Sequence, residues 1–266
     1  KSVTATFTRI TFSLQVNITP TGAATGSVTS NPAGINCTVT GGVGGGDCNE
    51  VFVTGTDVTL TASAPSGSRF VSWGGDCSGI QSTCLIDMTS AKTVSASFAK
   101  VWDLSVSKDG GSGSGSGTVA SSDSLINCGS DCTETYDHGT AVALTPTAAV
   151  GSRFGSWIGC DSVGPGNQCN VTMTAAKSVT ANFVKVWTLT VNITGGNTGT
   201  VSSSPAGISN CATSCTATFD HGQSVTLTRN GGGVSLGWSG GDGCSLLATD
   251  CSVTMNGDKT VTAQWA

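Results

Sequence analysis

Twelve cysteines are the residues whose type and spacing could do chemistry in this chain, and they fall four to each of three similar stretches. Cysteines bind metal ions or form disulfides. Zinc sites keep tight spacings such as C-x₂-C, whereas ten residues separate the first two cysteines of one stretch and three separate those of the other two. Because a loop disulfide tolerates such variation better than a coordination sphere does, the spacing favours two disulfides per stretch and an oxidising compartment.

We expect each cysteine to pair with its neighbour along the chain. Spacing alone leaves three connectivities open in each stretch. In the chain-entropy model, short closed loops of this size each contribute roughly 2–3 kcal/mol of stability. The expected disulfides are Cys37–Cys48, Cys77–Cys84, Cys128–Cys132, Cys160–Cys169, Cys211–Cys215 and Cys244–Cys251.

The two histidines, His138 and His221, both stand in the tripeptide Asp-His-Gly. A histidine could activate a serine or cysteine nucleophile, but such a site needs its partner residues. The first stretch has Val53-Thr-Gly at the same place, which favours a turn residue before glycine over a catalytic base. With no hydrolase, zinc-protease or phosphate-loop motif in the chain, we expect no enzyme, no catalytic residue and no cofactor.

Three aspartates recur in Gly- and Cys-rich loops, namely Asp76, Asp161 and Asp242. Carboxylates in glycine loops can bind calcium, but one carboxylate per loop is too few, so we expect no metal site. The six tryptophans could stack on sugars. Most recur at strand positions shared between the stretches, which favours a place in the core. The same interpretation applies to Met88, Met173 and Met255.

One seven-residue motif occurs four times, although the rest of the pattern occurs only three times. The copies start 91, 85 and 82 residues apart, which marks an array of small units, and they are Lys1–Phe7, Lys92–Phe98, Lys177–Phe183 and Lys259–Trp265. We therefore expect residues 1–8 to be the last strand of a preceding repeat. Three repeats would follow, which we call repeat 1 (9–99), repeat 2 (100–184) and repeat 3 (185–266). The chain would then be either a window from a longer array or a subunit with one extra strand.

Composition narrows the class of protein further. Glycine contributes 38 of 266 residues, which indicates many tight turns, and charged residues contribute only 10%. The net charge of −5 is diffuse, which argues against nucleic acid and anionic membrane surfaces as partners. No run of 18 apolar residues exists, so no segment is expected to insert in a membrane.

Each repeat is expected to contain six or seven short strands. In repeat 2 these cover residues 101–106, 117–119, 133–136, 141–145, 153–157, 171–173 and 178–183, with period-two alternation and Gly, Asn or Asp between them. The pattern predicts an all-β fold of three tandem, small, disulfide-stapled modules of β-sandwich or β-grasp type. Because almost no linker separates Phe98 from Trp102 or Phe183 from Trp187, we expect an extended rod.

Two local features refine this prediction. The aromatic residues of Arg69-Phe-Val-Ser-Trp73 are three apart, which predicts a β-bulge, and the shorter Leu236-Gly-Trp238 suggests that repeat 3 lacks it. The tract Gly110–Gly117 resembles a linker. Its position between the first two strands of repeat 2 instead predicts a mobile loop inside that repeat.

The three stretches resemble a known family. The residues that carry the resemblance are Gly199-Thr-Val-Ser-Ser-Ser-Pro-Ala-Gly-Ile208, the Gly-Trp-Ser-Gly-Gly around Trp238, Cys251-Ser-Val-Thr-Met255 and Lys259-Thr-Val-Thr-Ala, each with counterparts in repeat 1. They are similar to divergent internalin B-repeat-like modules (Listeria–Bacteroides type) of bacterial surface and secreted proteins. The resemblance implies an extracellular or cell-surface location and a role as a stalk, spacer or adhesive segment.

These observations lead to one principal hypothesis: a non-enzymatic extracellular structural protein that forms a rod, stalk or filament. Its partners would be other copies in head-to-tail order, or a larger parent surface protein. In one variant of this hypothesis the residues 1–8 pair with a neighbouring subunit by strand donation, with Val3, Ala5 and Phe7 as the inserted side chains. The alternative is a module that binds carbohydrate or a host surface.

Overall fold

The computed structural model describes residues 1–196, 199–246 and 248–266, and almost all of the ordered structure in them is β-strand. The one helical element among these residues is a single 3₁₀ turn, η1 (Pro165–Asn167). None of the described helical segments is long and apolar enough to cross a membrane. The predicted all-β fold of three tandem repeats is confirmed.

Repeat 1 is a two-layer sandwich. Its first sheet has the strand order β5-β1-β9-β7 and its second the order β4-β3-β2-β6-β8. The strands are β1 (Thr11–Thr21), β2 (Gly26–Asn31), β3 (Asn36–Thr40), β4 (Val43–Asp47), β5 (Asn49–Val53), β6 (Asp57–Ser63), β7 (Ser68–Gly75), β8 (Thr83–Asp87) and the first part of β9 (Lys92–Asp109).

Period-two alternation explains how the two sheets form one core. In β6 the side chains of Val58, Leu60 and Ala62 are buried, while the residues between them are not. Successive side chains of a strand point to opposite faces, so each strand contributes an apolar row to the space between the sheets. This core also contains Met88 and Phe98, both fully buried.

Repeats 2 and 3 use the same plan with fewer strands. Repeat 2 contains the second part of β9, then β10 (Gly117–Ser121), β11 (Thr133–Asp137), β12 (Ala141–Ala148), β13 (Ser152–Ile158), β14 (Ser162–Val163), β15 (Cys169–Thr172) and the first part of β16 (Lys177–Thr194). Repeat 3 contains the second part of β16, then β17 (Thr200–Ser204), β18 (Ser214–Asp220), β19 (Ser224–Asn230), β20 (Ser235–Ser239), β21 (Asp250–Thr254) and β22 (Lys259–Trp265). Met173 and Met255 are fully buried, as the sequence predicts.

The chain forms two compact units, and their boundary runs through repeat 2. One unit consists of Lys1–Leu104, Thr133–Val142 and Val171–Lys177. The other consists of Ser105–Cys132, Ala143–Asn170 and Ser178–Ala266. The contact of repeat 1 with repeat 2 therefore lies inside the first unit, and the contact of repeat 2 with repeat 3 lies inside the second.

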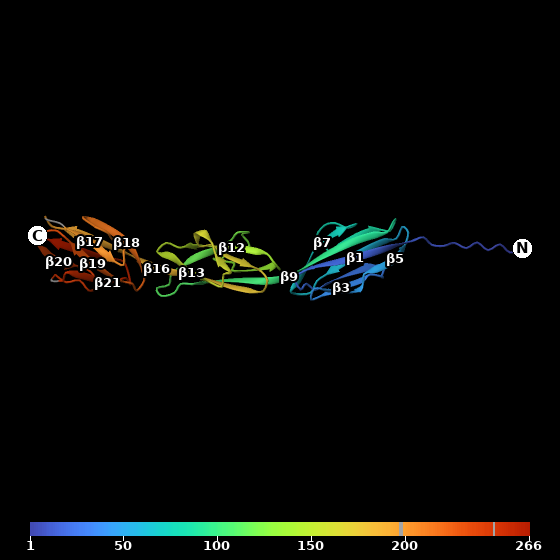
Figure 1. Ribbon diagram of the computed structural model, residues 1–266, viewed down its shortest axis with the longest axis horizontal. Coiled ribbons are helices and arrows are strands. Elements are labelled where there is room, and N and C mark those ends of the chain that lie inside the picture. Colours follow the sequence, from blue (N-terminus) through green and yellow to red (C-terminus); the bar gives the residue numbers. More distant parts are fainter. Residues whose placement is uncertain (197–198, 247) are drawn as a thin grey trace. The chain divides into compact units, whose positions relative to one another are not determined.

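Two long strands, β9 and β16, carry the chain from one repeat to the next (Figure 1). The sequence predicts separate strands before and after residues 99–100 and 184–185, but hydrogen-bonded backbone continues through both places. Residues 92–99 of β9 pair in parallel with β1, and residues 94–100 pair antiparallel with β7. The end of each repeat is therefore the beginning of the next, because one strand belongs to both.

The expected bulge is present in all three repeats. The register shifts between Phe70 and Ser72 in β7 and at the matching place in β13, as predicted. It also shifts between Ser235 and Gly237 in β20, so the expectation that repeat 3 lacks the bulge is wrong. Ser235 lies three residues before Trp238, as Phe70 lies three residues before Trp73 in repeat 1. Leu236 is the residue at the bulge.

Residues 1–10 precede β1 without regular secondary structure (Figure 1). Val3 and Phe7 are more than nine-tenths exposed. The matching residues of the later copies of the motif, Val94 and Phe98, are fully buried between two strands. The same motif is thus a core strand in one context and solvent-exposed in another.

These contrasting environments predict different costs for the same substitution. Phe98→Ala should lower the free energy of unfolding by about 3–5 kcal/mol, because it removes a fully buried ring. Phe7→Ala, the matched control, should change it by less than about 0.5 kcal/mol. Urea unfolding of both variants measures the difference, and equal effects would contradict the exposed placement of residues 1–10.

Candidate functional site

The contact between repeat 1 and repeat 2, which we call the first joint, is built around Trp102 at the centre of β9. The ammonium of Lys100 lies 5.0 Å from the centre of the Trp102 ring, within the range of a cation–π interaction. At the edge of the same indole ring, Trp102 Nε1 donates a hydrogen bond to His138 Nδ1 at 3.2 Å. His138 therefore carries its imidazole proton on Nε2.

An ion pair closes the first joint at its rim. Arg69, at the start of β7 in repeat 1, donates from Nε and Nη2 to the two carboxylate oxygens of Asp137, at the end of β11 in repeat 2, both at 2.5 Å. This fork-to-fork geometry is the strongest form of side-chain ion pair. Because the Arg69 side chain is 54% exposed, its contribution to stability is of the order of 1 kcal/mol or less.

His138 also fixes the joint through its backbone and its ring. Its backbone N–H donates to the Lys100 carbonyl at 2.7 Å. The ring lies against the loop of repeat 1 that follows β1, so closely that a Cβ on Gly22 would stand 2.7 Å from His138 Cγ. Only glycine therefore fits at position 22, where φ is +64°.

The second joint, between repeat 2 and repeat 3, repeats this arrangement inside the other compact unit. Lys185 lies 4.7 Å from the ring centre of Trp187, whose Nε1 donates to His221 Nδ1 at 3.0 Å. The backbone N–H of His221 donates to the Lys185 carbonyl at 2.8 Å. Arg153 pairs with Asp220 in the same bidentate manner, with one hydrogen bond of 2.6 Å from Nε to Oδ1.

The glycine- and serine-rich tract of repeat 2 belongs to the second joint. It connects β9 to β10 within the repeat, as predicted. Gly115 is buried, with the backbone of Phe183 within 2.5 Å of where its Cβ would stand. Gly113 lies against His221, where a Cβ would approach Cγ to 2.3 Å. These two glycines therefore pack at the joint, although the sequence predicted a mobile loop here.

The electrostatics of the two joints follow from these hydrogen bonds. The hydrogen bonds from the Arg153 guanidinium, together with its positive charge, lower the pKa of Asp220 below its ordinary value of 3.8, although partial burial acts in the opposite direction. The same pairing raises the pKa of Arg153, and the hydrogen bonds to Asp137 raise that of Arg69. These shifts favour the charged forms of Arg69, Arg153 and Asp220, as the ion-pair geometry implies.

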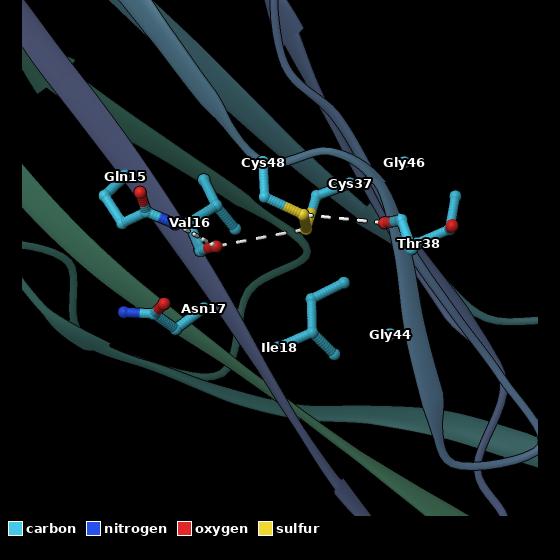
Figure 2. Close-up of a pocket in the computed structure, with 10 residues that line it drawn as sticks. Gln15, Val16, Asn17, Ile18, Cys37, Thr38, Gly44, Gly46 and Cys48 are labelled. Carbon is cyan, nitrogen blue, oxygen red and sulfur yellow. Dashed lines mark hydrogen bonds between the residues drawn. A yellow bond between two sulfur atoms is a disulfide. The ribbon is translucent and has the colours of Figure 1, made fainter.

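Six disulfides are present, and they join the neighbouring cysteines of each repeat. In repeat 1 the Cys37–Cys48 bridge lies beside a groove of about 290 Å³ between β1 and the β3–β4 hairpin (Figure 2). The Val16 carbonyl oxygen lies 3.9 Å from Cys37 Sγ, a contact that is not a hydrogen bond because a disulfide sulfur has no proton. The groove has no ionisable lining residue and thus offers no acid–base chemistry.

The other candidate residues have structural partners. Asp76 Oδ2 accepts a hydrogen bond from the Thr93 backbone N–H at 2.7 Å, and Asp242 pairs with Lys259 at 2.9 Å. Among the described residues, no three His, Cys, Asp or Glu side chains gather as a metal site. Trp73, Trp238 and Trp265 are buried, as predicted, whereas Trp102, Trp157 and Trp187 are half-buried.

The sequence analysis assigned Trp102 and Trp187 to the core and the histidines to turns. It did not predict the hydrogen bonds between these tryptophans and histidines. One signal was available in the pattern of the repeats. An Asp-His pair begins the turn of repeats 2 and 3, each preceded by a repeat with an arginine before its Phe-x-x-Trp segment. Repeat 1 lacks the Asp-His pair and repeat 3 lacks the arginine, so both residue sets occur together only at the two joints.

Comparison with known proteins identifies a family. A family model described as "Divergent InlB B-repeat domain" matches residues 27–101, 105–186 and 189–266. A search among curated proteins finds no match.

Several solved structures are similar to this chain. The Bacillus anthracis TIE protein is 9% identical with a TM-score of 0.30, and the alignment covers 96% of this chain and 50% of that one. The pilus adhesin SpaC from Lactobacillus rhamnosus GG is 8% identical with a TM-score of 0.35, over 96% and 42% of the two chains. BcpA, the major pilin subunit of Bacillus cereus, is 6% identical with a TM-score of 0.26, over 97% and 100%. The chain thus spans half or less of the length of the first two.

The close approach of Gly22 to His138 can be tested with a matched glycine. Gly22→Ala should destabilise the first joint more than Gly55→Ala, because both positions have positive φ but only Gly22 faces an imidazole ring, while a Cβ on Gly55 would meet nothing within 4 Å. We expect about 1 kcal/mol for Gly55→Ala and about 2–4 kcal/mol for Gly22→Ala. Thermal unfolding measures both. Adding His138→Ala should recover part of the Gly22→Ala loss and leave the effect of Gly55→Ala unchanged, and equal losses in the two glycine variants would contradict the contact.

Proposed function

Because this chain belongs to the divergent InlB B-repeat family, we propose that it serves as an extracellular structural array of stiffly joined β repeats. The observation that carries the proposal is that two joints, in different compact units, use the same five residue types in the same geometry. A flexible string of domains has no need of a repeated contact of this kind. The array would act as a stalk or spacer that holds other parts of a surface protein at a distance.

The shared strand supports stiffness at each joint. Bending at residues 99–100 would break the ladder in which Arg69 lies opposite Ala99, and also the hydrogen bond from the Val101 N–H to the Gly67 carbonyl at 3.1 Å. The ion pair and the Trp102–His138 hydrogen bond resist motion in the other directions. Each joint is therefore expected to resist bending between the two repeats that it connects.

An extracellular location agrees with the disulfides and with the small size of each repeat. Units of about 85 residues bury a limited core, and disulfides compensate in oxidising compartments. The charged residues of the joints form ion pairs, which suits a structural role.

Strand donation is the finer form of this proposal. The motif of Lys1–Phe7 corresponds in sequence to Lys259–Trp265 of β22, where Val261, Ala263 and Trp265 are the buried side chains. Val3, Ala5 and Phe7 have the same spacing, and phenylalanine takes the place of Trp265 in the two other repeats. Since each repeat already holds its own last strand, a donated segment would have to exchange with a resident one.

The carbohydrate-binding alternative gains less support from the structure. Sugar stacking requires an aromatic face open to solvent, and all six tryptophans are buried or half-buried. The half-buried Trp102 and Trp187 are already covered on one face by lysine. The groove of Figure 2 is lined by no aromatic residue.

Stiffness at a joint can be measured by small-angle X-ray scattering. Insertion of four glycines between Ala99 and Lys100 should interrupt β9 and broaden the distribution of interatomic distances, because the two repeats would then move independently. The same insertion after Gly79, in an exposed loop where a Cβ would meet nothing within 4 Å, is the control and should leave the distribution unchanged. A native chain that already scatters like the insertion variant would refute the proposed stiff array.

A further inference from the structure

Repeat 3 carries an arginine at a position where repeat 1 carries a core residue. In β19, Val225 and Leu227 point inward and are fully buried. Arg229 is the next residue of this inward-facing row, because successive side chains of a strand alternate between its two faces. Leu227 and Leu60 each lie opposite the last cysteine of their repeat. Arg229 therefore corresponds to Ala62 of repeat 1, which is buried.

The loss of an aromatic ring accompanies this arginine. In repeat 1 the centre of the Phe70 ring lies 5.0 Å from that of Trp73 and 5.5 Å from that of Phe98, and repeat 2 has the same cluster of three rings. Phe70 lies opposite Phe98 in its sheet. The residue at that place in repeat 3 is Ser235, opposite Trp265. Repeat 3 therefore lacks the ring that completes the cluster in the other two repeats.

The guanidinium of Arg229 lies against the remaining tryptophan instead. Its Cζ is 5.2 Å from the centre of the Trp238 ring, within the range of a cation–π interaction, and its Nη2 donates to the Ala248 carbonyl at 2.6 Å. Its Nη1 is buried and has no hydrogen-bond partner among the described residues. Arg69 and Arg153 pair with aspartates at the joints, whereas no carboxylate of the described residues pairs with Arg229. Because buried polar groups in proteins are nearly always hydrogen-bonded, this guanidinium calls for a partner from outside the chain.

Arg229 lines a pocket of about 200 Å³ in repeat 3. The other described residues of the lining are uncharged, and they are Gly231, Gly233, Ser235, Thr249 and Trp265. The indole N–H of Trp265 can only donate a hydrogen bond, and the two hydroxyls can donate as well. A Cβ on Gly232 would stand 2.4 Å from Trp265 Nε1, so glycine leaves room beside this donor. The pocket thus combines one positive charge with several hydrogen-bond donors.

The opening of this pocket is independent of any repeat that follows. The same place in repeats 1 and 2 is occupied by the rings of Phe70 and Phe154. Each of these repeats is followed by another one, and both phenylalanines nevertheless remain partly exposed to solvent. A following repeat therefore leaves this side of the sandwich open.

We propose that this pocket of repeat 3 binds the carboxylate group of a ligand. A carboxylate supplies the negative charge and the acceptor oxygens that the described residues around Arg229 lack, and hydrogen bonds to a charged acceptor are the strong ones. One guanidinium balances one negative charge, so a carboxylate suits the pocket better than a doubly charged phosphate does, in a chain whose net charge is already −5. Two sources carry such a group, an acidic sugar and a simple organic acid. The site is separate from the joints and does not rest on the stiffness of the array.

The test follows the NMR signals of the Trp265 indole N–H and the Arg229 Nε–H in the full chain. At constant ionic strength, acetate should shift both signals and saturate with a Kd of about 1–10 mM, as expected for so small a ligand. Acetamide has the same shape without the charge and should leave both signals nearly unchanged. Glucuronate that binds about tenfold more tightly than acetate would identify an acidic sugar as the ligand, and equal affinities would identify a simple organic acid.

Variants of the full chain show whether these residues form the site. Arg229→Ala introduces the residue of repeat 1 and should abolish binding of acetate. Ser235→Phe introduces the missing ring and should also abolish it, because the ring fills the pocket while the charge stays. Arg9→Ala removes the same charge from an exposed position and should bind acetate like the native chain. Thermal unfolding should show that each variant keeps the native fold.

Several outcomes would overturn the inference. Equal shifts with acetate and acetamide would show that the pocket does not recognise the charge. The absence of saturation below about 100 mM acetate, or unchanged binding by Arg229→Ala, would show that the pocket is not the site. Inorganic phosphate that binds more tightly than acetate would refute the assignment of a carboxylate. None of these outcomes bears on the scattering experiment, which decides the stiffness of the joints separately.

Discussion

The parallel pairing of each repeat's last strand with its first strand is the constraint on which the rest of the structure depends. In repeat 1 the ladder runs from Leu14 opposite Lys92 to Thr21 opposite Ala99, and repeat 3 has the same ladder between β16 and β22. This pairing closes the sandwich, buries the aromatic residue at the end of the motif and aims the chain directly into the next repeat. Since the strand does not end there, two neighbouring repeats share one piece of regular backbone.

Sharing a strand makes weak side-chain contacts effective. An exposed ion pair such as Arg69–Asp137 contributes little to the stability of an ordinary domain, because ordering two long side chains costs entropy. At the joints the backbone has already placed both partners, so little additional ordering is needed for the ion pair, the Trp–His hydrogen bond and the stacked lysine to form. Gly22 and Gly113 pack so closely against the imidazole rings that neither position has room for a Cβ atom.

The residues of each repeat therefore fall into two groups, those in the core and those at the joints. Residues that face the core, such as Val94 and Phe98, are nearly interchangeable between repeats because each sandwich has the same interior. Residues at the joints contact the neighbouring repeat instead: Asp137 pairs with Arg69, and His138 accepts a hydrogen bond from Trp102.

Local pattern alone determined much of this protein. Alternation predicted the strands of repeat 2, because side-chain direction in a strand follows from the backbone period. Recurrence predicted the array and the buried Met positions and most of the aromatic ones. Only the tertiary structure decided the joints, whose partners lie 68 residues apart for Arg69 and Asp137 and 36 apart for Trp102 and His138. The period of a strand does not determine which turn of the next repeat it will contact. That contact depends on the continuity of β9 from one sandwich to the next. The sequence around residues 99–100 had instead predicted a boundary between two strands.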